Sequence, residues 1–530
     1  MRIATLTPMF LDHAGTYYDD VVGVVADDGT SYTYGAVVER VNRLSNALVD
    51  LEFSAGDRAC VLSPNTHWCL EAMFGVQQVG GIFSPLNYRL LPDDYRDLLA
   101  DADPTVVLAD AAYADVLEGC RDVVPTATFV RYHPERSGAA GWLDYETLLA
   151  DSSGTGPDRP ELAEDHPATI NYTSGTTGEP KGVVRTHRTE FWNATIQAHN
   201  LGLNDGAVYL WTLPMFHVNG WGAMYAVTGW AGTHVCLRDF SPARVFELIR
   251  EHGVNVLAGP PTVLNRLVEF YEEEEPALDD RPLTVATAGA PPPRATIEAV
   301  EDELGWRLKH FYGHTESGPY TNSESPRRFV RDGRLTVKAK QGIPVPGNQL
   351  RVVDEDGNDV PRDDETLGEV VLRGNLVFDR YWRKPESTAD AFDDRVRGWF
   401  HSGDLGTVDE HGFVTIKDRK KDIIISGGEN ISSFEIEDTL YDLPGVQRVA
   451  VIPVPHPDWG ETPKAIIVRD PDVDLTVEAA HDHCRERLAG YKRPRVVEFV
   501  DELPETATGK VEKHKLREAH WGDEDRPGGG

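Results

Sequence analysis

The chain has 530 residues, with 87 Asp and Glu against 52 Lys and Arg, and a formal net charge of −35 at pH 7. This length predicts two or more domains, because a single hydrophobic core rarely extends over so many residues. The negative charge disfavours nucleic acid and anionic membrane surfaces as partners. No apolar run approaches the ~20 residues of a transmembrane helix, and the first ten residues lack the pattern of a secretory signal.

Two further features of the composition concern the environment of the protein. The five cysteines are scattered and form no Cys-x-x-Cys pair, which is typical of a reducing cytoplasm. The acidic residues are spread over the whole chain, which suggests adaptation to high salt, where screening weakens their mutual repulsion. Following unfolding while KCl is lowered from molar to millimolar tests this hypothesis, and unchanged stability would contradict it.

The first part of the chain alternates short apolar strands with amphipathic helices. Residues 57–63, 82–86 and 105–108 read as strands, and residues 66–79 and 92–102 read as helices. This alternation predicts a largely parallel sheet covered by helices. The same rhythm returns between residues 207 and 308, so we expect two such sheet subdomains. Residues 342–416 show short strands and Asp-Gly turns, which predict a smaller, β-barrel-like subdomain.

A charged segment, residues 418–422, separates two apolar strands, 413–416 and 423–425. We interpret it as a hinge between an N-terminal domain, residues 1–417, and a C-terminal domain, residues 423–521. The latter has an α+β pattern, and roughly a hundred residues suffice for a small independent domain. The polar, glycine-rich residues 522–530 are predicted to form a disordered tail. The predicted fold class is therefore α/β, with a small mobile α+β domain at the C-terminus.

Residues 172–182, Tyr-Thr-Ser-Gly-Thr-Thr-Gly-Glu-Pro-Lys-Gly, form the most informative stretch. They follow a predicted buried strand, 168–172, and precede a segment with helical spacing, 183–200, so we expect a strand-to-helix loop. Glycines let consecutive N–H groups turn toward one anion, and the hydroxyl groups and Lys181 add further donors. A Walker loop would have Ser or Thr after the lysine, where this chain has Gly182. The stretch predicts a cradle for a polyphosphate, the alternative being a polar surface loop.

Two other motifs carry residue types that suit a nucleotide. Residues 312–316, Tyr-Gly-His-Thr-Glu, follow an apolar strand that we expect to end at Phe311. A tyrosine ring offers a flat face to a purine, a threonine hydroxyl can donate to phosphate, and a carboxylate can hold Mg²⁺ beside phosphates. Asp404 follows Ser402-Gly403, and one carboxylate can accept from both hydroxyl groups of a ribose.

Together these motifs resemble the signature of the adenylate-forming superfamily, which includes acyl-CoA synthetases, firefly luciferase and the adenylation domains of peptide synthetases. The resemblance covers nearly the whole chain, because the motifs follow in the expected order. It implies that Tyr312 stacks on adenine and that Asp404 and Arg419 bind the ribose. It also implies that Thr315 and Glu316 lie at the phosphates and the metal. The loop residues that it assigns to ATP are Thr173, Ser174, Gly175, Thr176, Thr177, Gly178 and Lys181.

Further residues are assigned by the same resemblance. Gly289, Ala290 and Pro291 are similar to a segment at the adenine edge, although a simple turn is the alternative, and Gly313 also belongs to the nucleotide site. Residues 209–217 resemble the short- and medium-chain fatty-acid and aryl acyl-CoA ligases. The resemblance implies a metal site of Glu316 and Thr176, and an acyl pocket formed by His217, Trp221, Gly313 and His314.

The remaining residues that the resemblance assigns lie in the hinge and the C-terminal domain, apart from His314. Lys510 lies in a segment, 503–510, that resembles the catalytic lysine loop of the superfamily. Lys421 occupies the hinge position, where some relatives carry aspartate, and relatives also carry small or apolar residues at His314. The residues that resemble the coenzyme A surface, with ordinary surface packing as the alternative, are Trp459, Tyr491, Lys492 and Arg493.

We therefore predict an AMP-forming acyl-CoA synthetase that uses Mg²⁺, ATP, coenzyme A and a small carboxylic acid. His217, Thr315, Glu316 and Lys510 are its predicted catalytic residues. The acid attacks the α-phosphate of ATP to give acyl-AMP, and the C-terminal domain then rotates about Lys421 to admit coenzyme A. The sequence leaves the oligomeric state open, a homodimer included.

Three rival interpretations share some of these motifs. A luciferase-like enzyme or a stand-alone adenylation enzyme would use an acceptor other than coenzyme A. A peptide-synthetase module would need a carrier domain, which we do not expect in the twenty residues after Lys510. An inactive binding protein would be expected to lack Lys181, Glu316, Asp404 or Lys510, and the chain has all four.

Overall fold

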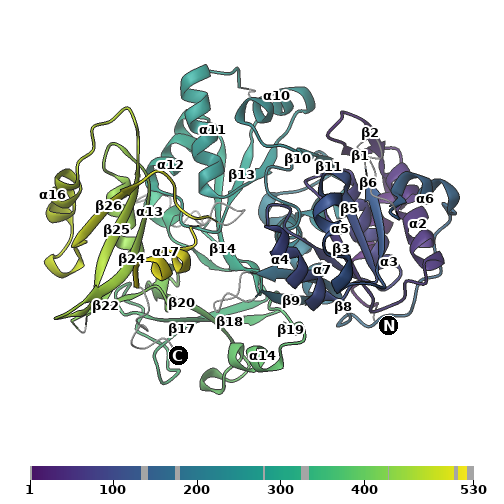
Figure 1. Ribbon diagram of the computed structural model, residues 1–530. Coiled ribbons are helices and arrows are strands. Elements are labelled where there is room, and N and C mark those ends of the chain that lie inside the picture. Colours follow the sequence, from purple (N-terminus) through teal and green to yellow (C-terminus); the bar gives the residue numbers. More distant parts are fainter. Residues whose placement is uncertain are drawn as a thin grey trace.

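The computed structural model describes residues 3–132, 141–173, 180–278, 281–323, 334–427, 429–505 and 511–521. Two large sheets and a smaller one make up the N-terminal part, and a fourth sheet forms the core of the C-terminal domain (Figure 1). In the described ranges, no helix combines the length and apolar character needed to cross a membrane.

The first large sheet contains eight strands in the order β19-β9-β8-β4-β3-β5-β6-β7. Its pairs from β4 to β7 are parallel, as the β–α alternation predicts. The strands are β3 (Arg58–Leu62), β4 (Ile82–Pro85), β5 (Val106–Asp110), β6 (Thr128–Tyr132), β7 (Leu143–Asp144), β8 (Pro167–Thr173), β9 (Lys181–Thr186) and β19 (Arg380–Tyr381). The helices of this part are α1 (Pro8–Tyr17), α2 (Tyr34–Asp50), α3 (His67–Gln78), α4 (Pro92–Ala102), α5 (Ala114–Glu118) and α6 (Tyr145–Asp151).

One predicted helix, residues 183–200, begins with a strand instead. Residues Lys181–Thr186 form β9, which pairs antiparallel with β8, and α7 (His187–Leu201) begins only afterwards. The Thr186 hydroxyl accepts a hydrogen bond from the Thr189 N–H group and caps the helix. Val183 and Val184 are β-branched residues that favour a strand. The expectation of a strand-to-helix phosphate loop was therefore wrong, because β8 and β9, the elements before and after the loop sequence, are antiparallel strands.

The second large sheet contains nine strands in the order β16-β15-β14-β13-β12-β10-β11-β1-β2. They are β1 (Val22–Val25), β2 (Ser31–Thr33), β10 (Val208–Leu210), β11 (Thr233–Val235), β12 (Val256–Ala258), β13 (Thr284–Thr287), β14 (Arg307–His314), β15 (Gly318–Asn322) and β16 (Ile343–Pro344). The helices are α8 (Val218–Trp221), α9 (Ala223–Gly229), α10 (Pro242–His252), α11 (Pro261–Glu274), α12 (Arg294–Glu298) and α13 (Arg334–Ala339). Strand β14 runs beyond Phe311, where we expected it to end, so Tyr312, Gly313 and His314 lie in the strand.

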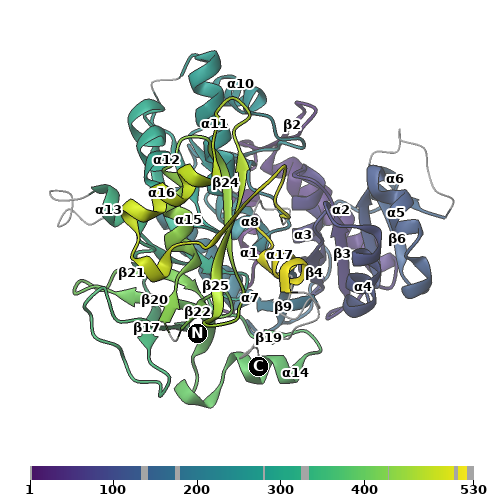
Figure 2. The ribbon, with the colours of Figure 1, turned by 60° about the vertical axis from the view of Figure 1, so that its left-hand side comes forward.

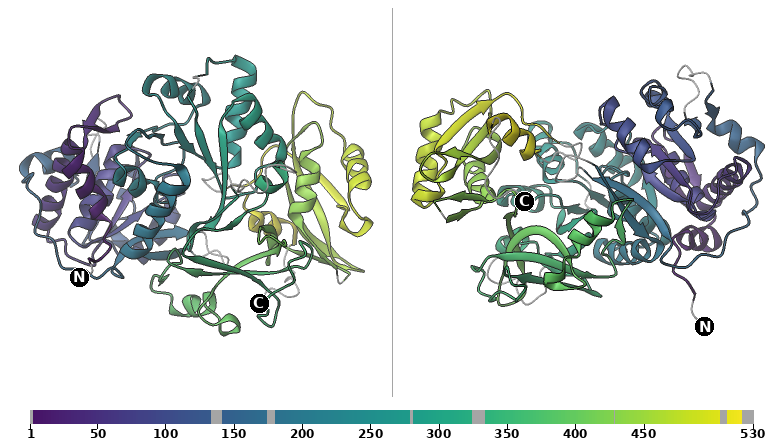
Figure 3. Two further views of the ribbon diagram at one scale, coloured as in Figure 1. Left: turned by 180° about the vertical axis from the view of Figure 1, so that it is seen from behind. Right: turned by 60° about the horizontal axis from the view of Figure 1, so that its bottom comes forward.

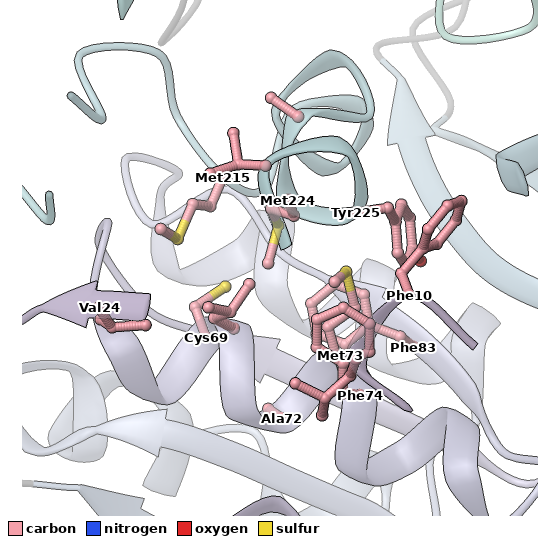
Figure 4. Packing of buried hydrophobic residues seen from close by; sticks show 14 of the residues in the cluster. Phe10, Val24, Cys69, Ala72, Met73, Phe74, Phe83, Met215, Met224 and Tyr225 are labelled. Atoms are coloured by element: carbon pink, nitrogen blue, oxygen red, sulfur yellow. The ribbon is translucent and has the colours of Figure 1, made fainter. Parts of the chain in front are cut away.

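The main core lies between the two large sheets. Residues from α1, α2, α3, α7 and α9 form one buried cluster with both sheets, while α4 and α5 cover one outer face and α10 to α12 cover the other. In Figure 4, Met224 and Tyr225 of α9 pack against Met73 and Phe74 of α3. These side chains are fully buried, and each such burial contributes about 1.5–3 kcal/mol. The shared core holds the two sheets in a fixed relation.

The small sheet lies next to the C-terminal domain, in the lower part of the right view of Figure 3. It is a four-stranded antiparallel sheet in the order β17-β18-β20-β21. Its strands are β17 (Asn348–Val353), β18 (Gly368–Gly374), β20 (Phe400–Val408) and β21 (Val414–Arg419), and α14 (Pro385–Ala391) lies beside it. Strand β21 continues through the first two residues of the predicted hinge segment 418–422, and a turn occupies residues 420–422.

The C-terminal domain has the predicted α+β pattern and comes forward in Figure 2. A long hairpin of β24 and β25 forms its centre, and β26 pairs with β25 in parallel. The strands are β22 (Ile424–Ser426), β23 (Glu429–Ile431), β24 (Val446–His456), β25 (Gly460–Arg469) and β26 (Val496–Val500), and the helices are α15 (Ser433–Tyr441), α16 (Val477–Arg487) and α17 (Lys513–Trp521). The predicted tail, 522–530, lies outside the described residues.

Candidate active site

The base of the predicted phosphate loop is formed by Thr173 and Lys181, which face each other across β8 and β9. The Lys181 ammonium lies 5.2 Å from the centre of the Tyr381 ring. The Tyr381 hydroxyl in turn donates to Glu316 Oε1 at 2.7 Å. Two predicted phosphate-site residues, far apart in sequence, therefore converge on one tyrosine. Ser174, Gly175, Thr176, Thr177 and Gly178 lie outside the described residues, and their assignments stay predictions.

The predicted phosphate and metal residues, Thr315 and Glu316, follow β14 directly. Their backbone is fixed on both sides: the Thr315 carbonyl accepts from Arg185 at 3.2 Å, and the Glu316 carbonyl accepts from the Phe378 N–H group at 2.7 Å. Tyr381, Arg185 and Phe378 were not predicted as site residues. The sequence carries one signal that could have indicated Arg185: a charged residue inside the apolar strand Val-Val-Arg-Thr.

The predicted ribose carboxylate, Asp404, is buried on β20. Its Oδ2 accepts from the Tyr312 hydroxyl at 2.8 Å, and Arg419 Nε lies 3.5 Å from its Oδ1. Asp404 and Arg419 are also paired neighbours on β20 and β21. Burial, reinforced by Asp404, raises the pKa of Tyr312 well above its usual value, so its hydroxyl remains a donor. The structure thus brings three predicted nucleotide residues together.

His314 makes a contact that the sequence prediction did not include. Its Nε2 lies 2.7 Å from Asp404 Oδ2, and its ring meets the Tyr312 ring edge-on with centroids 5.1 Å apart. The imidazole is therefore turned toward the predicted ribose carboxylate, although we had assigned His314 to the acyl pocket. Gly313 lies in close backbone packing, since a Cβ there would come 1.8 Å from the Gly318 carbonyl oxygen.

The predicted adenine-edge residues, Gly289, Ala290 and Pro291, lie in an exposed segment after β13. Strand β13 is the parallel neighbour of β14, and its last residue, Thr287, pairs with His310. The segment therefore leaves the sheet at the same edge as Tyr312. Ligands of open α/β sheets bind outside this carboxyl edge.

Of the predicted acyl-pocket residues, His217 precedes a left-handed turn and Trp221 belongs to it. Val218, Asn219, Gly220, Trp221 and Gly222 have φ values between 49° and 85°. Such backbone is costly for residues other than glycine and persists only where the surroundings hold it. A Cβ at Gly220 would lie 2.3 Å from the Trp211 ring, so the turn also requires a glycine there. His217 and Trp221 are partly exposed, whereas the residues between them are buried.

The predicted coenzyme A residues lie in the C-terminal domain, where Trp459 and Tyr491 are exposed. The Trp459 ring stacks on His456, with centroids 4.3 Å apart. Lys492 pairs with Glu435 at 2.7 Å, and Arg493 donates to the carbonyls of Leu488 and Arg485. In this arrangement both cations already contact protein groups, and each keeps further N–H donors for a phosphate.

Lys421, the predicted hinge residue, lies in the turn between β21 and β22 beside a buried charge cluster. In that cluster, Asp418 accepts from the backbone and hydroxyl of Ser433, at 2.6 and 2.7 Å. Lys513 Nζ lies 2.6 Å from the Ser433 hydroxyl and 2.7 Å from Glu437. The start of α17 is therefore tied to the hinge. The predicted catalytic residue, Lys510, lies outside the described residues.

Comparison with known proteins identifies the class. Residues 10–382 match the AMP-binding enzyme family, and residues 435–510 match the AMP-binding enzyme C-terminal domain. The chain therefore belongs to the AMP-binding enzyme family.

Individual relatives agree with this assignment. The chain is 37% identical to 4-hydroxybutyrate–CoA ligase 2 of Metallosphaera sedula, covering 97% of this chain and 94% of that protein. It is 34% identical to a benzoate–CoA ligase of Arabidopsis thaliana, covering 97% and 93% of the two chains.

Two solved structures of one relative also match this chain. The ATP-bound form of MatB from Rhodopseudomonas palustris matches with a TM-score of 0.86 at 28% identity, covering 98% of this chain and 99% of that one. The apo form matches with a TM-score of 0.75 at 29% identity over the same shares. Sequence identity and coverage are nearly equal for the two forms, so the higher TM-score shows that the overall structure of this chain is more similar to the ATP-bound form.

Proposed function

We propose that the protein is an AMP-forming acid–CoA ligase. It activates a carboxylic acid with ATP, giving acyl-AMP and pyrophosphate, and then transfers the acyl group to the coenzyme A thiol with release of AMP. The observation that carries the proposal is the convergence of Lys181 and Glu316 on Tyr381, at one site with the Asp404–Tyr312 pair. Its named relatives are CoA ligases.

The chemistry requires positioning and charge stabilisation and no side-chain nucleophile. A carboxylate oxygen of the acid attacks the α-phosphorus, and the bond to the pyrophosphate oxygen breaks. Lys181 and the segment 174–179 are assigned to the leaving pyrophosphate, and Thr315 to the phosphates. Asp404 and Arg419 orient the ribose, and His217 separates the phosphate site from the acyl pocket. In the second step the coenzyme A thiolate attacks the acyl carbonyl and AMP leaves.

Glu316 is the residue assigned to Mg²⁺, with Thr176 as a second predicted contact. Glu316 Oε1 accepts from Tyr381, which orients the carboxylate. The described ranges contain no group of three or more His, Cys, Asp or Glu that could enclose a metal ion. Glu316 therefore suits a metal held partly by ATP oxygens. When bound, Mg²⁺ neutralises the charge of the leaving pyrophosphate.

Removing the metal should abolish activity without unfolding the protein. Because Glu316 serves a substrate-borne metal and no protein cage, EDTA should stop pyrophosphate release while the thermal unfolding midpoint stays unchanged. Parallel assays of pyrophosphate release and circular dichroism, with excess Mg²⁺ restored as the control, measure both. A fall in the unfolding midpoint with EDTA would show that the metal is structural and that this role for Glu316 is wrong.

We assign the acid to the short- and medium-chain fatty acids or the aryl acids. Trp221 gives the predicted pocket an apolar wall. The charge of Arg185, which is linked to this wall through Glu190 and Asn219, is neutralised by Glu190 at 2.8 Å and therefore does not serve a second carboxylate. Named relatives act on 4-hydroxybutyrate and benzoate, which suits a small monocarboxylic acid.

A panel of acids tests the function and the substrate class together. We expect acid-dependent pyrophosphate release, and thioester formation only when coenzyme A is present. The largest kcat/KM should fall on an apolar monocarboxylic acid, with dicarboxylic and amino acids as matched controls of similar length. Highest activity on a dicarboxylate or an amino acid would reject the assigned class. Pyrophosphate release without any thioester would favour the alternative, an adenylating enzyme with another acceptor.

We also assign the protein to the cytoplasm. Its five cysteines, Cys60, Cys69, Cys120, Cys236 and Cys484, are unpaired and buried, which suits a reducing compartment.

A further inference from the structure

We propose that Arg185, Glu190 and Asn219 form a positioning network that fixes the acyl wall relative to Thr315 and Glu316. The network would thereby set the distance between the acid carboxylate and the α-phosphate. This inference rests on the proposed function, since it concerns the same site. The three residues act through the segments that they hold, and they are not assigned to the reacting atoms.

The centre of the network is an ion pair buried between β9 and α7. Arg185 Nε and Glu190 Oε1 are 2.8 Å apart, and both side chains are 0% exposed. Burying a carboxylate is costly unless hydrogen bonds from other groups accompany its ion pair. Here Glu190 accepts further hydrogen bonds from Asn219 at 2.9 Å and Asn193 at 3.4 Å, and the Thr169 hydroxyl lies within 3.2 Å. The carboxylate is thus held from several elements at once.

One arm of the network reaches the phosphate and metal motif. Arg185 Nη1 donates to the carbonyl oxygens of Thr315 and Leu376, both at 3.2 Å. These carbonyls belong to the two chain segments that meet at Glu316, because the Phe378 N–H group donates to the Glu316 carbonyl at 2.7 Å. The position of the Thr315–Glu316 backbone is therefore tied to the Arg185 guanidinium.

The other arm reaches the acyl wall. Asn219 lies in the left-handed turn between the wall residues His217 and Trp221, with φ 55° and ψ 45°. Its side-chain nitrogen donates to Glu190, and its side-chain oxygen accepts from Asn171 of β8 at 3.3 Å. Asn171 also donates to the Phe216 carbonyl at 3.3 Å. The residues on both sides of His217 are thus fixed, which explains how a turn with such costly backbone is maintained.

Asn193 joins the two arms at a second point. A Cβ on Gly222, at the end of the turn, would lie 2.4 Å from the Asn193 side-chain nitrogen. A Cβ on Gly318, two residues after Glu316, would lie 3.1 Å from its side-chain oxygen. Both glycines therefore pack directly on this carboxamide, which is itself bonded to Glu190. The acyl wall and the phosphate motif share one rigid support.

A double-mutant cycle between the two arms tests the proposal. Arg185→Met removes the anchor of Thr315, and Asn219→Gly releases the acyl wall while still allowing a left-handed backbone. Each single variant should lower the kcat of acid-dependent ATP–pyrophosphate exchange by ~10–10²-fold, because misplacement by about 1 Å can cost 10²-fold. Rates are taken per active site, counted from the acyl-AMP burst, so that unfolded protein does not contribute. If Arg185→Met does not fold, Glu190→Gln replaces it in the cycle.

The control is a second, partly buried ion pair, Arg40–Glu71, at 2.6 Å on α2 and α3. Glu71→Gln should lower the unfolding midpoint and leave kcat per active site unchanged. The network predicts that the double variant loses much less than the product of the single losses, because both arms act through Glu190. Fully multiplicative losses, or an equal fall in kcat with Glu71→Gln, would overturn it. A wild-type enzyme without exchange activity on any acid would instead refute the proposed function.

Discussion

Replacing Lys510 by alanine should slow acyl-AMP formation by at least ~10²–10³-fold, the loss typical of one preorganised charge-stabilising group. The resemblance assigns Lys510 to the charge that develops between the acid carboxylate and the α-phosphate. The described residues that flank the segment 506–510 are bonded to one another. Glu505 and Val511 pair as a β-bridge, and the Glu512 N–H group donates to the Pro504 carbonyl at 2.8 Å.

The same variant should still convert preformed acyl-AMP to the thioester at a near-normal rate. The reason is that the resemblance assigns Lys510 only to the step before the C-terminal domain rotates. Stopped-flow measurement of each half-reaction checks both expectations. Lys515→Ala is the matched control, because Lys515 is exposed on α17 and pairs with Glu512, three residues away. Equal slowing of both half-reactions by Lys510→Ala would rule out alternation of the C-terminal domain about Lys421.

Replacing Asp404 by alanine should lower kcat/KM for ATP by roughly 10²-fold. Two hydrogen bonds from the ribose to a carboxylate contribute about 1.5 kcal/mol or more each, and 1.4 kcal/mol is tenfold. The buried carboxylate is already oriented by Tyr312 and His314, at 2.8 and 2.7 Å. A carboxylate offers about four acceptor positions, so the ribose can join these donors.

The ribose hydroxyl groups of the nucleotide can be removed in parallel with the Asp404 carboxylate. Wild-type enzyme should prefer ATP over 2′,3′-dideoxy-ATP by a similar factor, and Asp404→Ala should not distinguish the two nucleotides. Steady-state pyrophosphate release with each nucleotide provides the ratio of the two kcat/KM values. Asp359→Ala, an exposed position paired with Arg351 near the same sheet, should keep the wild-type ratio. Undiminished preference for ATP in Asp404→Ala would remove Asp404 from the ribose site.

The sequence predicted most elements of the fold because their patterns are local. Strand 57–63 and helix 92–102 are continuous runs with a single period, and both are present as β3 and α4. The segment 183–200 was misassigned at its start, because Val183 and Val184 fit a helical face as well as a buried strand. Only the pairing with Asn171 and Ile170 of β8 decides between the two, and such pairing cannot be read from one segment.

The residues of the candidate site could be predicted where they belong to a short sequence motif whose side chains suit a nucleotide. Tyr312, Asp404 and Arg419 were assigned separately, and the structure brings them together. Tyr381 was missed, because its link to Glu316 spans 65 positions and no local pattern marks it. The contact of His314 with Asp404 was missed for a similar reason, since it depends on β14 continuing to His314.

We expect the enzyme to form acyl-AMP first and coenzyme A to consume this intermediate in the second half-reaction. Excess enzyme mixed with ATP and a radiolabelled acid, without coenzyme A, should give bound acyl-AMP and one equivalent of pyrophosphate within a single turnover. Adding coenzyme A to this complex should convert the label to the thioester and release AMP. Label appearing in acyl phosphate with ADP as the nucleotide product, or no pyrophosphate before coenzyme A is added, would contradict the account.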